Sequence, residues 1–111
     1  MSKAFQRSKR LLKASEYSHV FAKADKISDG FWTLIVRPND VGYARLGLAI
    51  AKKALPRAVD RNRMKRIARE SFRQSHDSMP AVDIVVLTRR GSAKQENADL
   101  FLSLQKCWAK L

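Results

Sequence analysis

The feature that most constrains the fold is an amphipathic, cationic segment at residues 60–73. Apolar or small side chains recur there at helical spacing, so a helix would gather them on one stripe facing a core. They are Met64, Ile67, Ala68, Ser71 and Phe72. Asp60 precedes this stripe and is predicted to be the N-cap. Five polar residues fall within an arc of about 100° on the opposite side; they are Asn62, Lys65, Arg66, Arg69 and Arg73.

The charge balance of this region favours a polyanionic partner. From Lys52 to Arg73 there are nine basic residues and two acidic ones, Asp60 and Glu70. A run of charged residues on a helix most often only faces solvent. In this segment, however, like charges repel one another by about a few tenths of a kcal/mol per pair unless phosphates neutralise them. Arginine outnumbers lysine in the segment. A guanidinium can hold a phosphate with two hydrogen bonds or stack on a base, and structured RNA offers partners for both contacts.

The whole chain has the same bias, with 23 Lys and Arg residues against 10 Asp and Glu and a net charge of +13. Nucleic acid is therefore the leading partner class; mere solubility or contact with an anionic membrane surface are the alternatives. No apolar stretch is long enough to span a membrane, and no signal peptide is recognisable. Cys107 cannot form an internal disulfide, and no zinc-ligand cluster is present. We expect a cytoplasmic protein.

The remaining pattern predicts a single domain over residues 1–111, in which residues 1–14 form a basic, extended arm. A short helix is expected from Ser15 to Ala24, then strands at 31–38, 45–51 and 82–88 and a last helix. That last helix would place on one face Phe101, Leu104, Trp108 and Leu111. In the 45–51 strand one face is large and apolar, whereas the other carries small residues and leaves room for something to lie against it. This order predicts an α/β sandwich with helices packed on one small sheet.

Few residues are candidates for direct chemistry. Tyr17, Phe21, Phe31 and Trp32 could stack on unpaired bases or could belong to the core. His76 stands beside Asp77, but no positioned Ser, Cys or second carboxylate accompanies it. The sequence thus offers no catalytic constellation and no Mg²⁺ cage made of side chains.

Residues 57–73, RAVDRNRMKRIARESFR, resemble the RNR signature of the bacterial ribonuclease P protein subunit. The flanking pieces agree with that family in order and spacing, namely RLLKASEYSHVF at 10–21, RLGLAIAKK at 45–53 and MPAVDIVVLTRRG at 79–91. The resemblance covers about residues 5–110. It implies a four-stranded mixed sheet with a left-handed βαβ crossover, against the usual right-handed rule.

The resemblance also implies a function and its residues. The family's protein joins a catalytic RNA, which removes the 5′ leader of precursor tRNA using Mg²⁺ bound mainly by the RNA. The matching positions for the catalytic RNA are Arg61, Asn62, Lys65, Arg66 and Arg69, with Arg57, Arg63 and Arg73 as weaker candidates. Those for a cleft that holds the single-stranded leader are Tyr17, Phe21, Lys52 and Lys53. No catalytic or metal-ligating residue is expected in the protein, which would be a monomer when free and present once per catalytic RNA.

Three other classes remain as alternatives. A ribosomal or ribosome-assembly protein would share the size and charge. A DNA-binding regulator would need a base-reading helix and usually a dimer interface, and no second apolar face is visible. A freestanding nuclease would need a carboxylate cluster, whereas the ten acidic residues are scattered.

Overall fold

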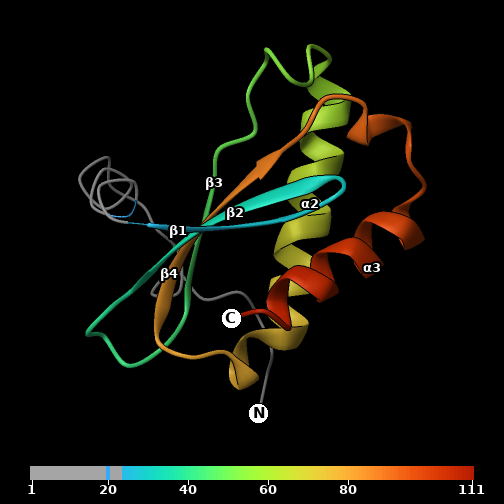
Figure 1. Ribbon diagram of the computed structural model, residues 1–111. Helices are drawn as coiled ribbons and strands as arrows, with labels where there is room; N and C mark the ends of the chain where they lie inside the picture. The colour runs from blue at the N-terminus through green and yellow to red at the C-terminus, as the bar shows by residue number, and fades with distance from the viewer. Residues whose placement is uncertain (1–19, 21–23) are drawn as a thin grey trace.

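The computed structural model describes Val20 and residues 24–111, which form a four-stranded sheet with two helices on one side (Figure 1). Along the chain the elements are β1 (Asp25–Asp29), β2 (Trp32–Pro38), β3 (Arg45–Leu48), α2 (Ala58–Ser75), β4 (Val82–Thr88) and α3 (Asn97–Trp108). Short 3₁₀ turns at His76–Ser78 and Ser92–Lys94 precede β4 and α3. The predicted α/β class, with a small sheet and packed helices, is confirmed.

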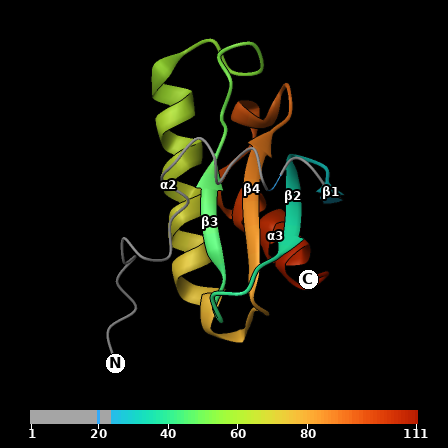
Figure 2. The ribbon, with the colours of Figure 1, turned by 90° about the vertical axis from the view of Figure 1, so that its left-hand side faces the viewer.

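The sheet is mixed, with strand order β1-β2-β4-β3. β2 pairs antiparallel with β1 and β4, whereas β3 pairs parallel with β4. In Figure 2 β3 and β4 both run upward, β4 lies to the right of β3, and α2, which connects them, lies on the far side of the sheet. This arrangement is the left-handed crossover that the resemblance implied.

The main core lies between the sheet and the helices. Alternate residues of β2 face it, because Trp32, Leu34 and Val36 are buried while their neighbours are half-buried. The indole Nε1 of Trp32 donates a 3.0 Å hydrogen bond to the carbonyl of Leu100 on α3, which satisfies the only polar group of that buried ring. The core reading of Trp32 is therefore confirmed, and Phe31 is a half-buried residue at the edge of the same cluster.

The opposite face of the sheet carries the small side chains that the sequence places on β3. Val20 is fully buried and packs there with Val85, together with the partly buried Ile35, Ala49 and Leu87. Part of the room beside the small residues is thus filled by Val20 of the same chain. The rest of the expected helix at 15–24 lies outside the described residues, except that Ala24 is not helical.

Two predicted strands need correction. The strand at 31–38 is the second and not the first, because β1 precedes it and pairs with it through a tight turn at Gly30 and Phe31. β1 carries a single large apolar residue, Ile27, and as an edge strand it shows no alternating pattern. The strand expected at 45–51 ends at Leu48, although the Ala49 amide still bonds to the Val86 carbonyl at 2.9 Å.

Two helix ends also differ from expectation. The N-cap of α2 is Arg57, so Asp60 lies inside the first turn, where its charge complements the helix dipole. The apolar periodicity of the sequence did not indicate this earlier start of the helix, because Val59 in the first turn is 60% exposed and does not join the buried stripe. At the other end of the chain α3 stops at Trp108, so Leu111 packs against the core from beyond the helix.

Candidate nucleic-acid interface

Helix α2 separates apolar and cationic side chains as the sequence predicted. Its buried residues are Met64, Ile67, Ala68, Ser71 and Phe72. On the side away from the core, Asn62, Arg66 and Arg69 are exposed, whereas Lys65 and Arg73 are half-buried. The helix thus anchors itself by one stripe and presents fixed positive charge on the other.

Two arginines of the predicted interface bind backbone carbonyls of the chain itself. Arg61 Nη1 donates to the carbonyls of Leu55 and Pro56 at 2.9 and 2.8 Å, which ties α2 to the segment before it. Arg63 reaches the segment before α3 and donates from Nη2 to the Ala93 carbonyl at 2.7 Å. We therefore assign both side chains a structural role, which sequence matching to an RNA-contact motif did not reveal.

Arg73 is engaged by a neighbour on the same helix. Its guanidinium forms a salt bridge with Glu70, three residues earlier, through two hydrogen bonds. The hydrogen bond from Arg73 holds the pKa of Glu70 below its usual range. The sequence placed Glu70 off the basic arc, but its carboxylate neutralises one end of that arc.

The other cations of the region have no such partner among Val20 and residues 24–111. No hydrogen bond or ion pair within that part of the chain engages the side chains of Arg57, Lys65, Arg66 or Arg69. Because these groups repel one another and are not neutralised internally there, an external polyanion would gain from contacting them. We call Arg57, Asn62, Lys65, Arg66 and Arg69 the α2 cationic face.

The residues predicted to hold a single-stranded leader are only partly described. Tyr17 and Phe21 lie outside the described residues. Lys52 and Lys53 are exposed in a turn that follows β3, closed by hydrogen bonds from the amides of Ala54 and Leu55 to the Ala51 carbonyl. The two lysines therefore stand at the end of β3, between the sheet and the start of α2.

One polar cluster was missed in the sequence. Asp83 of β4 is buried and accepts hydrogen bonds of 2.8 Å from Arg45 Nε, Arg45 Nη2 and Asn39 Nδ2. Asn39 also binds the Tyr43 carbonyl and accepts from the Val41 amide, so the cluster holds the loop between β2 and β3. The acidic Asp83 within the otherwise apolar run VDIVVLT was the available signal.

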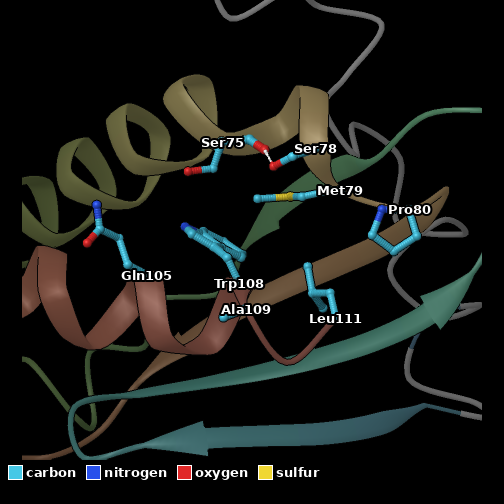
Figure 3. Close-up of a pocket in the computed structure, with 8 residues that line it drawn as sticks. All are labelled: Ser75, Ser78, Met79, Pro80, Gln105, Trp108, Ala109 and Leu111. Carbon is cyan, nitrogen blue, oxygen red and sulfur yellow. Dashed lines mark hydrogen bonds between the residues drawn. The ribbon is translucent and has the colours of Figure 1, made fainter.

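A hollow of about 400 Å³ lies between the end of α2 and the end of α3 (Figure 3). It is lined by Ser75, Ser78, Met79, Pro80, Gln105, Trp108, Ala109 and Leu111, none of which has a charged side chain. Nearby His76 is not a free surface histidine. Its ring stacks on that of Phe72 with the ring centroids 5.6 Å apart, and its Nδ1 lies 3.1 Å from Asp77 Oδ1. This end of the molecule does not extend the α2 cationic face.

Neither a metal-ligand cluster nor a membrane-spanning helix is found in the described part of the chain. Within it, no group of three or more His, Cys, Asp or Glu side chains could hold a metal ion. Neither described helix is long and apolar enough to cross a membrane.

The mixed sheet, its left-handed crossover and the cationic face of the crossover helix place the chain among small α/β domains that carry a basic helix on one side of the sheet. The family model named Ribonuclease P matches residues 5–111. The chain belongs to this family, as the protein component of the ribonucleoprotein that processes the 5′ end of tRNA.

Individual relatives agree with this assignment. The chain is 48% identical over 108 residues to the ribonuclease P protein component of Legionella pneumophila (strain Corby), covering 97% of this chain and 93% of that one. It is 47% identical over 111 residues to that of Thioalkalivibrio sulfidiphilus, with coverage of 100% and 92%.

Solved structures show the same fold. The ribonuclease P protein of Staphylococcus aureus superimposes with a TM-score of 0.85 at 24% identity, covering 92% of this chain and 94% of that one. The protein from Thermotoga maritima does so with a TM-score of 0.82 at 24% identity and coverage of 92% and 96%.

Proposed function

We propose that the protein binds the catalytic RNA of ribonuclease P through the α2 cationic face, and that the RNA performs the hydrolysis. The proposal rests on the two different faces of α2. Its buried stripe anchors the helix, whereas Arg66 and Arg69 are exposed and have no internal counter-charge in the described part of the chain. Phosphates would supply that counter-charge, and the counterions released from the RNA would add a salt-dependent gain in affinity.

In this proposal the protein contributes by lowering the electrostatic repulsion between the two RNA molecules during the reaction. Leader cleavage brings two polyanions together, so a domain of net charge +13 between them lowers their repulsion. We assign Mg²⁺ to the RNA, because phosphate oxygens are among the hard ligands that this cation prefers. The protein then lowers the Mg²⁺ concentration needed for cleavage without donating a catalytic group.

We further propose that the single-stranded 5′ leader of precursor tRNA lies in a cleft that uses Tyr17, Phe21, Lys52 and Lys53. The exposed position of Lys52 and Lys53 at the end of β3 supports this, since their charges are open to a backbone running past the sheet. Aromatic side chains at the other two positions would stack on bases at about 1–3 kcal/mol per base. We propose one protein per catalytic RNA, a monomer when free, and a cytoplasmic location.

The catalytic-RNA contact is tested by measuring the affinity of the protein for ribonuclease P RNA as a function of salt. The double variant Arg66→Ala/Arg69→Ala is expected to bind at least tenfold more weakly, with a salt slope smaller by about two, one for each lost phosphate contact. The matched control is Lys26→Ala/Lys106→Ala, which removes two exposed cations from β1 and α3. Equal losses in both variants would contradict a specific role for α2.

The leader contact is tested in the assembled holoenzyme. We expect Tyr17→Ala and Phe21→Ala to reduce the affinity for precursor tRNA while the affinity for mature tRNA, which has no leader, stays unchanged. An unaltered preference for the precursor over the mature form would refute the proposed cleft. Lys26→Ala is the control, because that side chain lies on the edge strand β1.

A further inference from the structure

Helix α3, like α2, has an exposed stripe opposite its buried one, but the stripe on α3 is uncharged. Three exposed residues lie there within an arc of about 60°, and we call them the outer stripe of α3; they are Ala98, Leu102 and Gln105. Among the large apolar side chains of the described residues, only Val59 is more exposed than Leu102, at 60% against 53%. This stripe gains little from a phosphate backbone, since nucleic-acid affinity comes mainly from lysine and arginine.

The outer stripe of α3 borders a hollow of about 360 Å³ that lies between α3 and the turn from β1 to β2. Leu102 lines the hollow on the side of the helix, and the half-buried Phe31 lines it on the side of the turn. Apolar surface that is open to solvent beside a hollow is typical of a protein-binding site. The hollow can take a large apolar side chain from a partner.

The walls of the hollow are fixed to each other by hydrogen bonds. Ser103 Oγ on α3 donates a 2.6 Å hydrogen bond to the carbonyl of Asp29, the last residue of β1. One residue beyond the turn, Trp32 Nε1 donates to the Leu100 carbonyl of α3 at 3.0 Å. Because the turn is held against the helix before any ligand arrives, little entropy is lost in ordering the site on binding.

Two carboxylates line this hollow, although the whole protein has a net charge of +13. Asp29 ends β1, and Asp99 lies in the first turn of α3. Lys106 also lines the hollow, but no hydrogen bond or ion pair within Val20 and residues 24–111 engages either carboxylate. The two carboxylates repel phosphates and attract a cation, so the hollow is complementary to a basic ligand with an apolar part.

The hollow lies away from the surface proposed to bind the catalytic RNA. α3 packs against β1 and β2, whereas α2 packs beside β3 at the other edge of the sheet (Figure 2). No residue of α2 lines the hollow. RNA that is bound to the α2 cationic face therefore leaves the hollow accessible.

We propose that the outer stripe of α3 and the hollow beside it dock a second protein, whose contacting segment carries a large apolar side chain next to a lysine or arginine. The apolar side chain enters the hollow against Phe31 and Leu102, and the cation pairs with Asp29 or Asp99. The partner joins the ribonucleoprotein without displacing RNA, because it uses the edge of the domain that carries β1.

The test begins by selecting short random peptides on the holoenzyme assembled with ribonuclease P RNA, so that the α2 cationic face is already occupied. We expect the selected peptides to share a lysine or arginine beside a large apolar residue. One synthetic peptide of this pattern, labelled with a fluorophore, is then the probe whose affinity is measured. Selection of no peptide, or of peptides without a basic residue, would overturn the proposal.

Variants of the hollow locate the binding of the probe peptide. Leu102→Ser is expected to weaken it by about tenfold, because the main apolar contact is lost. Asp29→Asn/Asp99→Asn is expected to weaken it by about fivefold, because the cation loses its partners. The matched controls are Val41→Ser and Asp25→Asn/Asp40→Asn, which make the same changes at exposed positions outside the hollow. Equal losses in the controls would overturn the proposed site.

The same variants distinguish a protein partner from an RNA partner. With purified RNA alone, Leu102→Ser and Asp29→Asn/Asp99→Asn should bind the catalytic RNA and support cleavage of precursor tRNA no worse than the wild type, since no protein partner is present. A lower RNA affinity in a variant that a thermal melt shows to be folded would mean that this surface contacts RNA, and would overturn the proposal. The result does not depend on Arg66 and Arg69, so the α2 proposal stands or falls separately.

Discussion

Glu70 and Arg73, three residues apart on α2, are joined by a salt bridge that consists of two hydrogen bonds. Gln74 also donates to Glu70, at 3.0 Å. The pair removes one cation from the exposed side of the helix and adds a negative charge near the phosphates that the other cations would bind. Glu70 is therefore expected to reduce RNA affinity.

Replacing Glu70 by Gln should strengthen binding to the catalytic RNA. The substitution removes the negative charge and releases Arg73, so one further phosphate contact becomes possible, worth about fivefold at roughly 0.15 M salt. Titration of labelled RNA checks this, with Asp40→Asn in the loop between β2 and β3 as the control of equal charge change. Unchanged binding of Glu70→Gln would show that Glu70 does not oppose RNA binding, and weaker binding would show that Arg73 is better placed when Glu70 holds it.

Arg61 and Arg66 should differ in what their loss affects. Arg61→Ala leaves two backbone carbonyls without their donor, so we expect it to lower the free energy of unfolding by about 1–2 kcal/mol. Arg66→Ala removes an exposed side chain and should change stability by less than about 0.5 kcal/mol, while weakening RNA binding. Chemical denaturation and RNA titration of both variants check the contrast, and equal stability of the two would contradict it.

The two helices are linked by Trp108, whose Nε1 donates a 2.8 Å hydrogen bond to Ser71 Oγ. Both residues are buried, so Ser71→Ala leaves the indole donor unpaired at a cost of about 1–3 kcal/mol. The exposed Ser78 provides a control, Ser78→Ala, that should cost less. Denaturation curves of equal midpoint for the two variants would show that the bond adds nothing.

Cys107 should make stability depend on pH in the alkaline range. Burial raises the pKa of its thiol to about 11, so the folded state keeps a proton that the unfolded chain loses near pH 8.5. This contribution is present below the unfolded pKa and is lost as the pH rises through the folded one. Relative to Cys107→Ala, the free energy of unfolding of the protein should fall between about pH 9 and 11. Denaturant unfolding at several pH values checks this, and an equal pH dependence of the two proteins would contradict the assignment.

The sequence was most informative where large side chains repeat. The spacing of Met64, Ile67 and Phe72 predicted the buried stripe of α2, and the apolar run at 82–88 predicted β4. β1 was missed because it is an edge strand with Ile27 as its single large apolar residue. Its pairing depends on the neighbouring strand rather than on its own pattern.

The candidate site was predictable in its charge but not in its contacts. Arg61 and Arg63 look like RNA ligands in the sequence because the carbonyls that they bind, those of Pro56 and Ala93 among them, leave no side-chain signal. Likewise the closeness of the turn at 89–94 to α2 follows from tertiary packing and not from sequence spacing.

We propose that, through its α2 cationic face, the protein assists an RNA that performs the chemistry. The most direct measurement is 5′ cleavage of precursor tRNA by bacterial ribonuclease P RNA at low Mg²⁺, with the wild-type protein, with Arg66→Ala/Arg69→Ala and with Lys26→Ala/Lys106→Ala. We expect the wild type and the control Lys26→Ala/Lys106→Ala to restore cleavage, and Arg66→Ala/Arg69→Ala at the same concentration not to restore it. Equal rescue by all three proteins, or none by the wild type, would contradict it.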